Sequence, residues 1–91
     1  MDKQHFQAIV NAVGAKETQG WWEVPEGKGV TLYVASQGVQ LMIPRAIAIR
    51  VDEKLLHAKT AKGETYVVQE DDVFAGAIDG GVSTTRKAGF L

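Results

Sequence analysis

The stretch GWWEVPEGKGVTLYV, residues 20–34, places two tryptophans next to each other in a segment with β-strand character. Neighbouring side chains of a strand point to opposite faces of the sheet, so Trp21 and Trp22 cannot both enter one core. The pattern of the strands around this segment predicts which of the two is buried. It also indicates what the other tryptophan faces.

The chain of 91 residues predicts one domain that needs a well-filled core or a partner. A net charge of −1 argues against a protein devoted to duplex DNA, which needs a basic footprint. Without cysteines there is no disulfide, cysteine zinc site or thiol nucleophile. The first residues contain no long apolar run, so we expect neither a signal peptide nor a membrane span, and a cytoplasmic location.

The N-terminal segment has the spacing of an amphipathic helix. Its apolar residues recur at helical intervals and form one stripe: Phe6, Ile9, Val10 and Val13. Asp2 is expected to cap the helix at its start, and Gly14 is expected to end it. Because so short a helix is marginal alone, its stripe is expected to dock on the rest of the domain.

The period then changes from helical to alternating, which is typical of strands. Glycine-containing turns at 25–29, 37–38 and 62–63 separate the alternating runs, and Pro44 interrupts one of them. Residues 70–79, with Phe74 and Ile78 four apart, predict a short C-terminal helix. The expected domain is therefore residues 1–79, followed by a flexible tail at 80–91.

The turn lengths predict a register for this meander. In the first two hairpins, Val24 would pair with Val30, Leu32 would lie between Trp22 and Ile43, and Val34 would pair with Leu41. In the later hairpins, Val51 would pair with Leu56, Ala58 would lie between Ile49 and Val67, and Thr60 would pair with Thr65. This register collects one apolar face, which is the predicted core: Trp22, Val24, Val30, Leu32, Val34, Val39, Leu41, Ile43, Ile47, Ile49, Val51, Leu56, Ala58 and Val67.

Trp21 then points to the opposite, outer face, where the register places it beside Tyr33 and Met42. Exposed apolar groups of this kind mark interaction surfaces. Three explanations stay open for this patch: closure of the sheet or coverage by the tail or a helix, a homodimer, or a separate partner. The other end of the same face carries a basic and aromatic group made of Arg50, His57, Lys59 and Tyr66.

Several patterns could carry chemistry, and each has a simpler explanation. The GKG at 27–29 lacks the longer frame of a phosphate loop and suits a turn. The acidic residues Glu70, Asp71, Asp72 and Asp79 could hold a cation, but helix capping explains Asp71 or Asp72. His57 as a base would require an orienting carboxylate.

The sequence thus predicts an α+β fold, in which an N-terminal helix precedes a curved antiparallel meander of about five strands, with an SH3-like half-barrel as one form. We expect a non-enzymatic interaction or regulatory module without cofactor or metal. It would form a homodimer through Trp21, Tyr33 and Met42. The alternative is a module for single-stranded nucleic acid that uses Arg50, His57, Lys59 and Tyr66.

Overall fold

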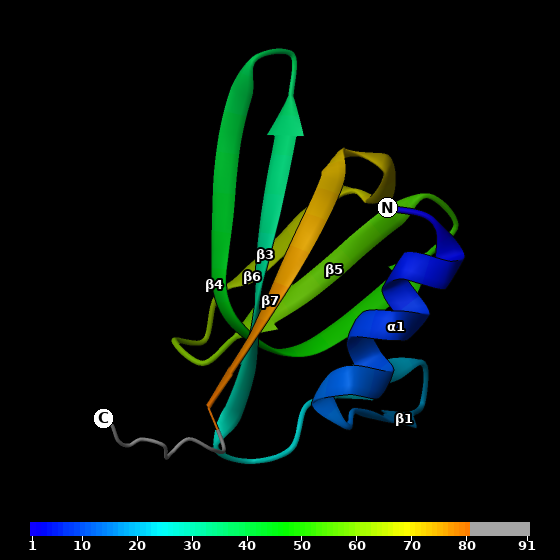
Figure 1. Cartoon of the computed structure of the whole chain (residues 1–91), viewed down its shortest axis with the longest axis vertical. Helices are drawn as coiled ribbons and strands as arrows, with labels where there is room; N and C mark the ends of the chain where they lie inside the picture. Colours follow the sequence, from blue (N-terminus) through cyan, green and yellow to red (C-terminus); the bar gives the residue numbers. More distant parts are fainter. Residues whose placement is uncertain (81–91) are drawn as a thin grey trace.

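The structure, a computed structural model, describes residues 1–80 and contains one α-helix and an antiparallel sheet (Figure 1). The sheet has seven strands and not the predicted five, because β1 and β7 are added to the meander. The predicted tail lies outside the described residues, except for Gly80. The elements in chain order are α1 (Lys3–Val13), β1 (Lys16–Thr18), β2 (Trp21–Glu23), β3 (Lys28–Ser36), β4 (Val39–Asp52), β5 (Leu55–Thr60), β6 (Thr65–Gln69), the 3₁₀ turn η1 (Glu70–Asp72) and β7 (Val73–Gly80).

The helix α1 confirms its prediction. The Asp2 carboxylate accepts a hydrogen bond of 2.8 Å from the backbone N–H of His5, which satisfies one of the free amides of the first turn. Gly14 ends the helix in the left-handed conformation, at a φ of 80°, which glycine adopts without strain. The apolar stripe of α1 is buried against the sheet.

The predicted hairpin between β2 and β3 is wrong, although both strands exist. Trp22 pairs with Ile49 of β4, not with Leu32 of β3. Because β2 and β3 both run antiparallel to β4, they cannot form a hairpin with each other, and residues 25–27 loop out between them. Pro25 and Gly27 make this loop, in which the Pro25 carbonyl accepts a 3.1 Å hydrogen bond from the Lys28 N–H.

Two other hairpins have the predicted register. The turn at Gln37 and Gly38 sets Val34 against Leu41, and the turn after Asp52 sets Val51 against Leu56. Both residues of the first turn have positive φ, as a two-residue hairpin turn requires. Further pairs, Leu32 with Ile43 and Ile49 with Ala58, confirm the same alignment.

The hairpin between β5 and β6 is one residue out of the predicted register. Ala58 pairs with Tyr66 instead of Val67, because the turn spans residues 61–64 and not 62–63 alone. The Thr60 N–H closes it on the Glu64 carbonyl at 2.8 Å. A slip of one residue exchanges the faces, so Val67 is 53% exposed and Tyr66 packs against the core.

A bulge in β4 corrects the predicted core at a second place. Val30 pairs with Ala46 and Leu32 with Ile43, so β4 has one residue more than β3 between these pairs. Arg45 lies in the bulge at a φ of 48°. As a result Ala46 enters the core, and Ile47, predicted to be buried, is exposed.

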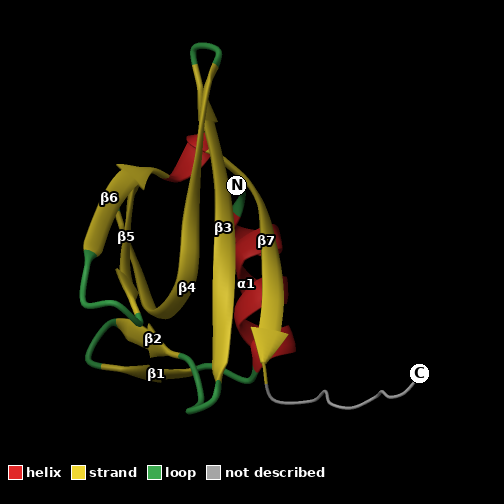
Figure 2. Ribbon diagram, turned by 90° about the vertical axis from the view of Figure 1, so that its left-hand side faces the viewer, coloured by secondary structure: helices red, strands yellow, loops and turns green. Residues whose placement is uncertain are grey.

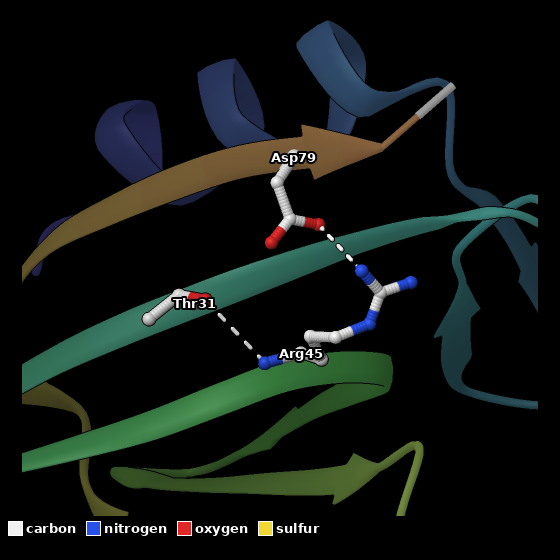
Figure 3. A network of polar contacts seen from close by, with 3 residues as sticks. All are labelled: Thr31, Arg45 and Asp79. Atoms are coloured by element: carbon white, nitrogen blue, oxygen red, sulfur yellow. Dashed lines mark hydrogen bonds and ion pairs between the residues drawn. The ribbon is translucent and has the colours of Figure 1, made fainter. Parts of the chain in front are cut away.

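Side chains across three strands meet at this bulge (Figure 3). The backbone N–H of Arg45 donates to the Thr31 hydroxyl at 3.4 Å, and its guanidinium lies 3.3 Å from the Asp79 carboxylate. These contacts link β4, β3 and β7. The ion pair is half-exposed, so its contribution to stability is small.

The predicted C-terminal helix is wrong. Only the 3₁₀ turn η1 forms there, and residues 73–80 make the edge strand β7, paired with β3. The two glycines within 73–80 disfavour a helix, and pairing with β3 satisfies the backbone. At Gly76 an added Cβ would lie 2.8 Å from Ile9 of α1, so the missing side chain lets the helix approach β7 closely.

The sheet is open: within residues 1–80, β1, β6 and β7 each pair on one side only. The helix covers its inner face, and the core lies between the two, with Trp22 packed edge-on against Phe6 at 6.3 Å. Trp22 is thus the inner tryptophan, as predicted. The β3–β4 hairpin extends as an arm beyond this core (Figure 2), which leaves Val39 and Leu41, both predicted to be buried, exposed.

Candidate functional site

Two surfaces stand out: one on the β3–β4 arm beside the start of β7, and one where β2 lies against the outer face of β4 and β5. Figure 2 shows the tip of the arm at one end of the molecule and β1–β2 at the other. We call the first the arm patch. It consists of apolar and aromatic residues of β3, β4 and β7: Tyr33, Val39, Leu41, Met42 and Phe74. We call the second the Trp21 cluster, and it consists of Trp21, Arg50, His57 and Lys59.

Strand pairing brings the arm patch together. Tyr33 pairs with Met42 across the hairpin, as the predicted surface requires. Phe74 joins them because β7 bulges there, between the pairs of Tyr33 and Val34, and its ring centroid lies 6.3 Å from that of Tyr33. Phe74 is 54% exposed. The sequence pattern assigned it to a helix and therefore missed it.

The arm patch has a shallow hollow of about 300 Å³, lined by Tyr33, Val34, Gln40, Leu41, Met42 and Phe74. No charged residue occurs between Lys28 and Arg45, so both strands of the arm are neutral. Proteins normally protect projecting strands with lysines and other charges. The arm lacks this protection and carries apolar residues on both of its faces: Tyr33 and Met42 with Phe74 on the outer face, and Val39 and Leu41 on the face that continues from the core.

The Trp21 cluster differs from the predicted grouping. Trp21 was expected beside Tyr33 and Met42, but pairing of β2 with β4 sets it on the outer face near Arg50 instead. The Lys59 ammonium lies 4.4 Å from the centroid of the Trp21 ring, and the Arg50 guanidinium lies 5.8 Å from it. Both distances are within the range of cation–π attraction. The His57 ring meets Trp21 edge-on at 6.4 Å.

Alternation along β4 and β5 explains this convergence. Arg50 pairs with His57, and Lys59 follows His57 two residues later on the same face. The buried neighbours Leu56, Ala58 and Thr60 point to the core and hold the outward residues in place. Arg50 also forms a 3.0 Å ion pair with Asp52, whereas no carboxylate of residues 1–80 pairs with Lys59.

Tyr66 was predicted to lie with this group and does not. The register of β6 turns it to the inner face, where its hydroxyl donates a 3.3 Å hydrogen bond to the Glu64 carboxylate. The negative charge of Glu64 raises the pKa of the Tyr66 hydroxyl, because ionisation would place two negative charges side by side; burial and the hydrogen bond add to the shift.

This arrangement predicts that Glu64→Gln lowers the pKa of Tyr66. In a Tyr33→Phe background, tyrosinate absorbance should then develop at lower pH than with Glu64 present, because the repelling carboxylate is gone. An absorbance titration measures the midpoint, and Glu53→Gln, which removes a distant exposed carboxylate, serves as the control. An unchanged midpoint in Glu64→Gln would contradict the assigned cause.

Next to Lys59 lies a larger hollow of about 550 Å³. The 25–27 loop and the first residue of β3 form one side, and the outer face of β4 and β5 forms the other. Three basic side chains line it, Lys28, Arg45 and Lys59, together with Glu23 and Glu26. Of the GKG segment only Gly27 lies in the loop, because Lys28 and Gly29 begin β3, so the predicted hairpin turn at 25–29 is wrong. The loop borders a partly basic hollow.

The metal site and the histidine base considered from the sequence find no matching arrangement of side chains in the described part of the chain. Residues 1–80 contain no group of three or more histidine and acidic side chains placed to hold a metal ion. No carboxylate hydrogen-bonds His57 there. The helix among these residues is too short and too polar to cross a membrane.

Comparison with known proteins gives no relative from which a role could be transferred. No protein-family model matches the chain, and neither a curated protein nor a solved structure matches it. The two surfaces therefore have to be interpreted from their own chemistry.

Proposed function

We propose that this protein is a non-enzymatic interaction module that self-associates through the arm patch. The observation that supports this most directly is the neutral, apolar and exposed arm formed by β3 and β4, with Phe74 of β7 at its side. Interface cores are depleted in charge and enriched in aromatic residues and methionine. Tyr33, Met42 and Phe74 are residues of these kinds.

A second copy of the chain suits this patch better than a charged partner does. In a two-fold dimer the same patch meets itself, so any charge on it would oppose an equal charge. The uncharged stretch between Lys28 and Arg45 avoids that repulsion. The hollow among Tyr33, Leu41, Met42 and Phe74 offers each copy a place for a side chain of the other.

Met42→Asp is expected to weaken self-association at least about a hundredfold. Two-fold symmetry would place two buried aspartates in the interface, each without a partner. Sedimentation equilibrium over a wide concentration range measures the dissociation constant. The fold should persist, because Met42 is half-exposed in the single chain and its side chain does not enter the core.

Leu55→Asp is the matched control, because Leu55 is similarly exposed but lies at the turn between β4 and β5. It should leave the dissociation constant within about twofold of the unchanged protein. Phe74→Asp tests the patch from another strand and should act like Met42→Asp. A chain that sediments as a monomer at every concentration, or a dimer that Met42→Asp leaves intact, would refute the proposal.

A further inference from the structure

The Trp21 cluster and the hollow beside it form a second surface, with a chemistry opposite to that of the arm patch. We propose that this surface binds single-stranded nucleic acid. A base would stack on Trp21, and the phosphates on either side would contact Arg50 and the basic side chains near the hollow. This site shares no residue with the arm patch.

The outer face of the sheet presents the Trp21 ring, with the Lys59 ammonium over it. Trp21 is half-buried and keeps part of its surface accessible, while β2, β4 and β5 hold the residues around it in register. Proteins that bind single strands combine aromatic side chains on such a surface with basic groups that follow the backbone. The flat Trp21 ring suits an unpaired base, because a base outside a duplex can expose a face for stacking.

The basic groups extend from Trp21 in two directions. Arg50 lies on one side, and on the other Lys59 leads into the hollow that Lys28 and Arg45 also line. Lys59 and Lys28 have no ion-pair partner among residues 1–80, so their charges are available to an anion. Arg50 forms an ion pair with Asp52, and Arg45 forms one with Asp79, so their charges are partly neutralised.

The acidic residues limit what can bind. Glu23 and Glu26 border the hollow, and the whole chain has a net charge of −1. A duplex would bring many phosphates against this mixed surface, whereas a short single strand needs only the few basic contacts available. A base that stacks on Trp21 would displace the Lys59 ammonium from the ring, and that ammonium could then contact a phosphate.

Fluorescence anisotropy of a labelled oligothymidylate of about ten nucleotides tests the proposal at low salt. We expect saturable binding whose affinity falls with added salt, with a logarithmic slope of about −2 for roughly three phosphate contacts. Trp21→Ala should weaken binding about tenfold or more through lost stacking. Lys59→Gln should weaken it and make the salt slope shallower.

Two controls separate the proposed site from general charge effects. Lys3→Ala removes one positive charge from the helix on the inner face and should leave binding nearly unchanged. Inorganic polyphosphate, which has the charge but no bases, should compete poorly with the oligonucleotide. Circular dichroism confirms that each variant is folded.

No binding at low salt would overturn the proposal, and so would equal competition by polyphosphate or an equal loss in Lys3→Ala and Lys59→Gln. Met42→Asp separates this proposal from the one above, because it should weaken self-association while each separate chain still binds the oligonucleotide at its own site. If the protein binds the oligonucleotide but does not self-associate, the result would support the nucleic-acid site and refute only the proposed dimer.

Discussion

Ile43→Ala is expected to lower the free energy of unfolding by about 2–5 kcal/mol, whereas Leu41→Ala should lower it by less than about 1 kcal/mol. Both residues lie on the same alternating face of β4, two positions apart. Ile43 is 0% exposed, but Leu41 is 42% exposed. The difference arises because the core ends near Ile43 and the arm continues beyond it, so only Ile43 leaves a cavity when truncated.

Urea unfolding followed by circular dichroism measures both variants. Protein should be dilute enough for any dimer to dissociate, since Leu41 belongs to the proposed interface. Equal losses at the two positions would mean that the arm folds back on the core, and would contradict the projecting hairpin. A small loss at both would contradict the burial of Ile43.

Ala58→Asp is expected to leave little folded protein, while Val67→Asp should lower the free energy of unfolding by no more than about 1 kcal/mol. Ala58 is completely buried between the sheet and the rest of the core, where a carboxylate would have no partner. The cost of an uncompensated buried charge is several kcal/mol, comparable to the whole stability of a small domain.

Comparing Ala58→Asp with Val67→Asp tests the register of β6 against β5 as well as the burial of Ala58. The alternation of the sequence places Ala58 and Val67 on one face, and the observed pairing of Ala58 with Tyr66 separates them. Thermal unfolding of the two aspartate variants distinguishes the registers directly. Severe loss in Val67→Asp would favour the register expected from a two-residue turn at Lys62 and Gly63.

The proposed dimer and the proposed nucleic-acid site together imply a further property of the protein. A dimer through the arm patch would leave the Trp21 cluster of each copy uncovered, because the two surfaces share no residue. Two linked sites on one nucleic-acid chain would then bind more tightly than either site alone. This would offset the small number of basic groups that each copy offers.

Local sequence patterns determined the helix α1 and two of the hairpins. The apolar stripe from Phe6 to Val13, with its cap at Asp2 and its stop at Gly14, needs no distant contact to be recognised. The short turns after Ser36 and Asp52 set their registers within a few residues. The alternation also predicts Trp22 on the core face, where it packs against Phe6.

For the candidate sites, the sequence indicated that Tyr33 and Met42 are neighbours, and that Arg50, His57 and Lys59 share a face. It could not place Trp21 correctly, because that depended on which strand β2 pairs with. Phe74 was missed for a related reason: pairing with β3, remote in sequence, turned a segment with helical spacing into a strand.

The tertiary structure alone decided the remaining features. A one-residue bulge at Arg45 puts Ala46 in the core where Ile47 was predicted. A longer turn before β6 puts Tyr66 against the core where Val67 was predicted. The period of a strand is two residues, so one extra residue reverses every side chain that follows until a second irregularity restores the phase. Alternation in sequence therefore identifies the strands, but long-range pairing and the position of each bulge decide which face is the core.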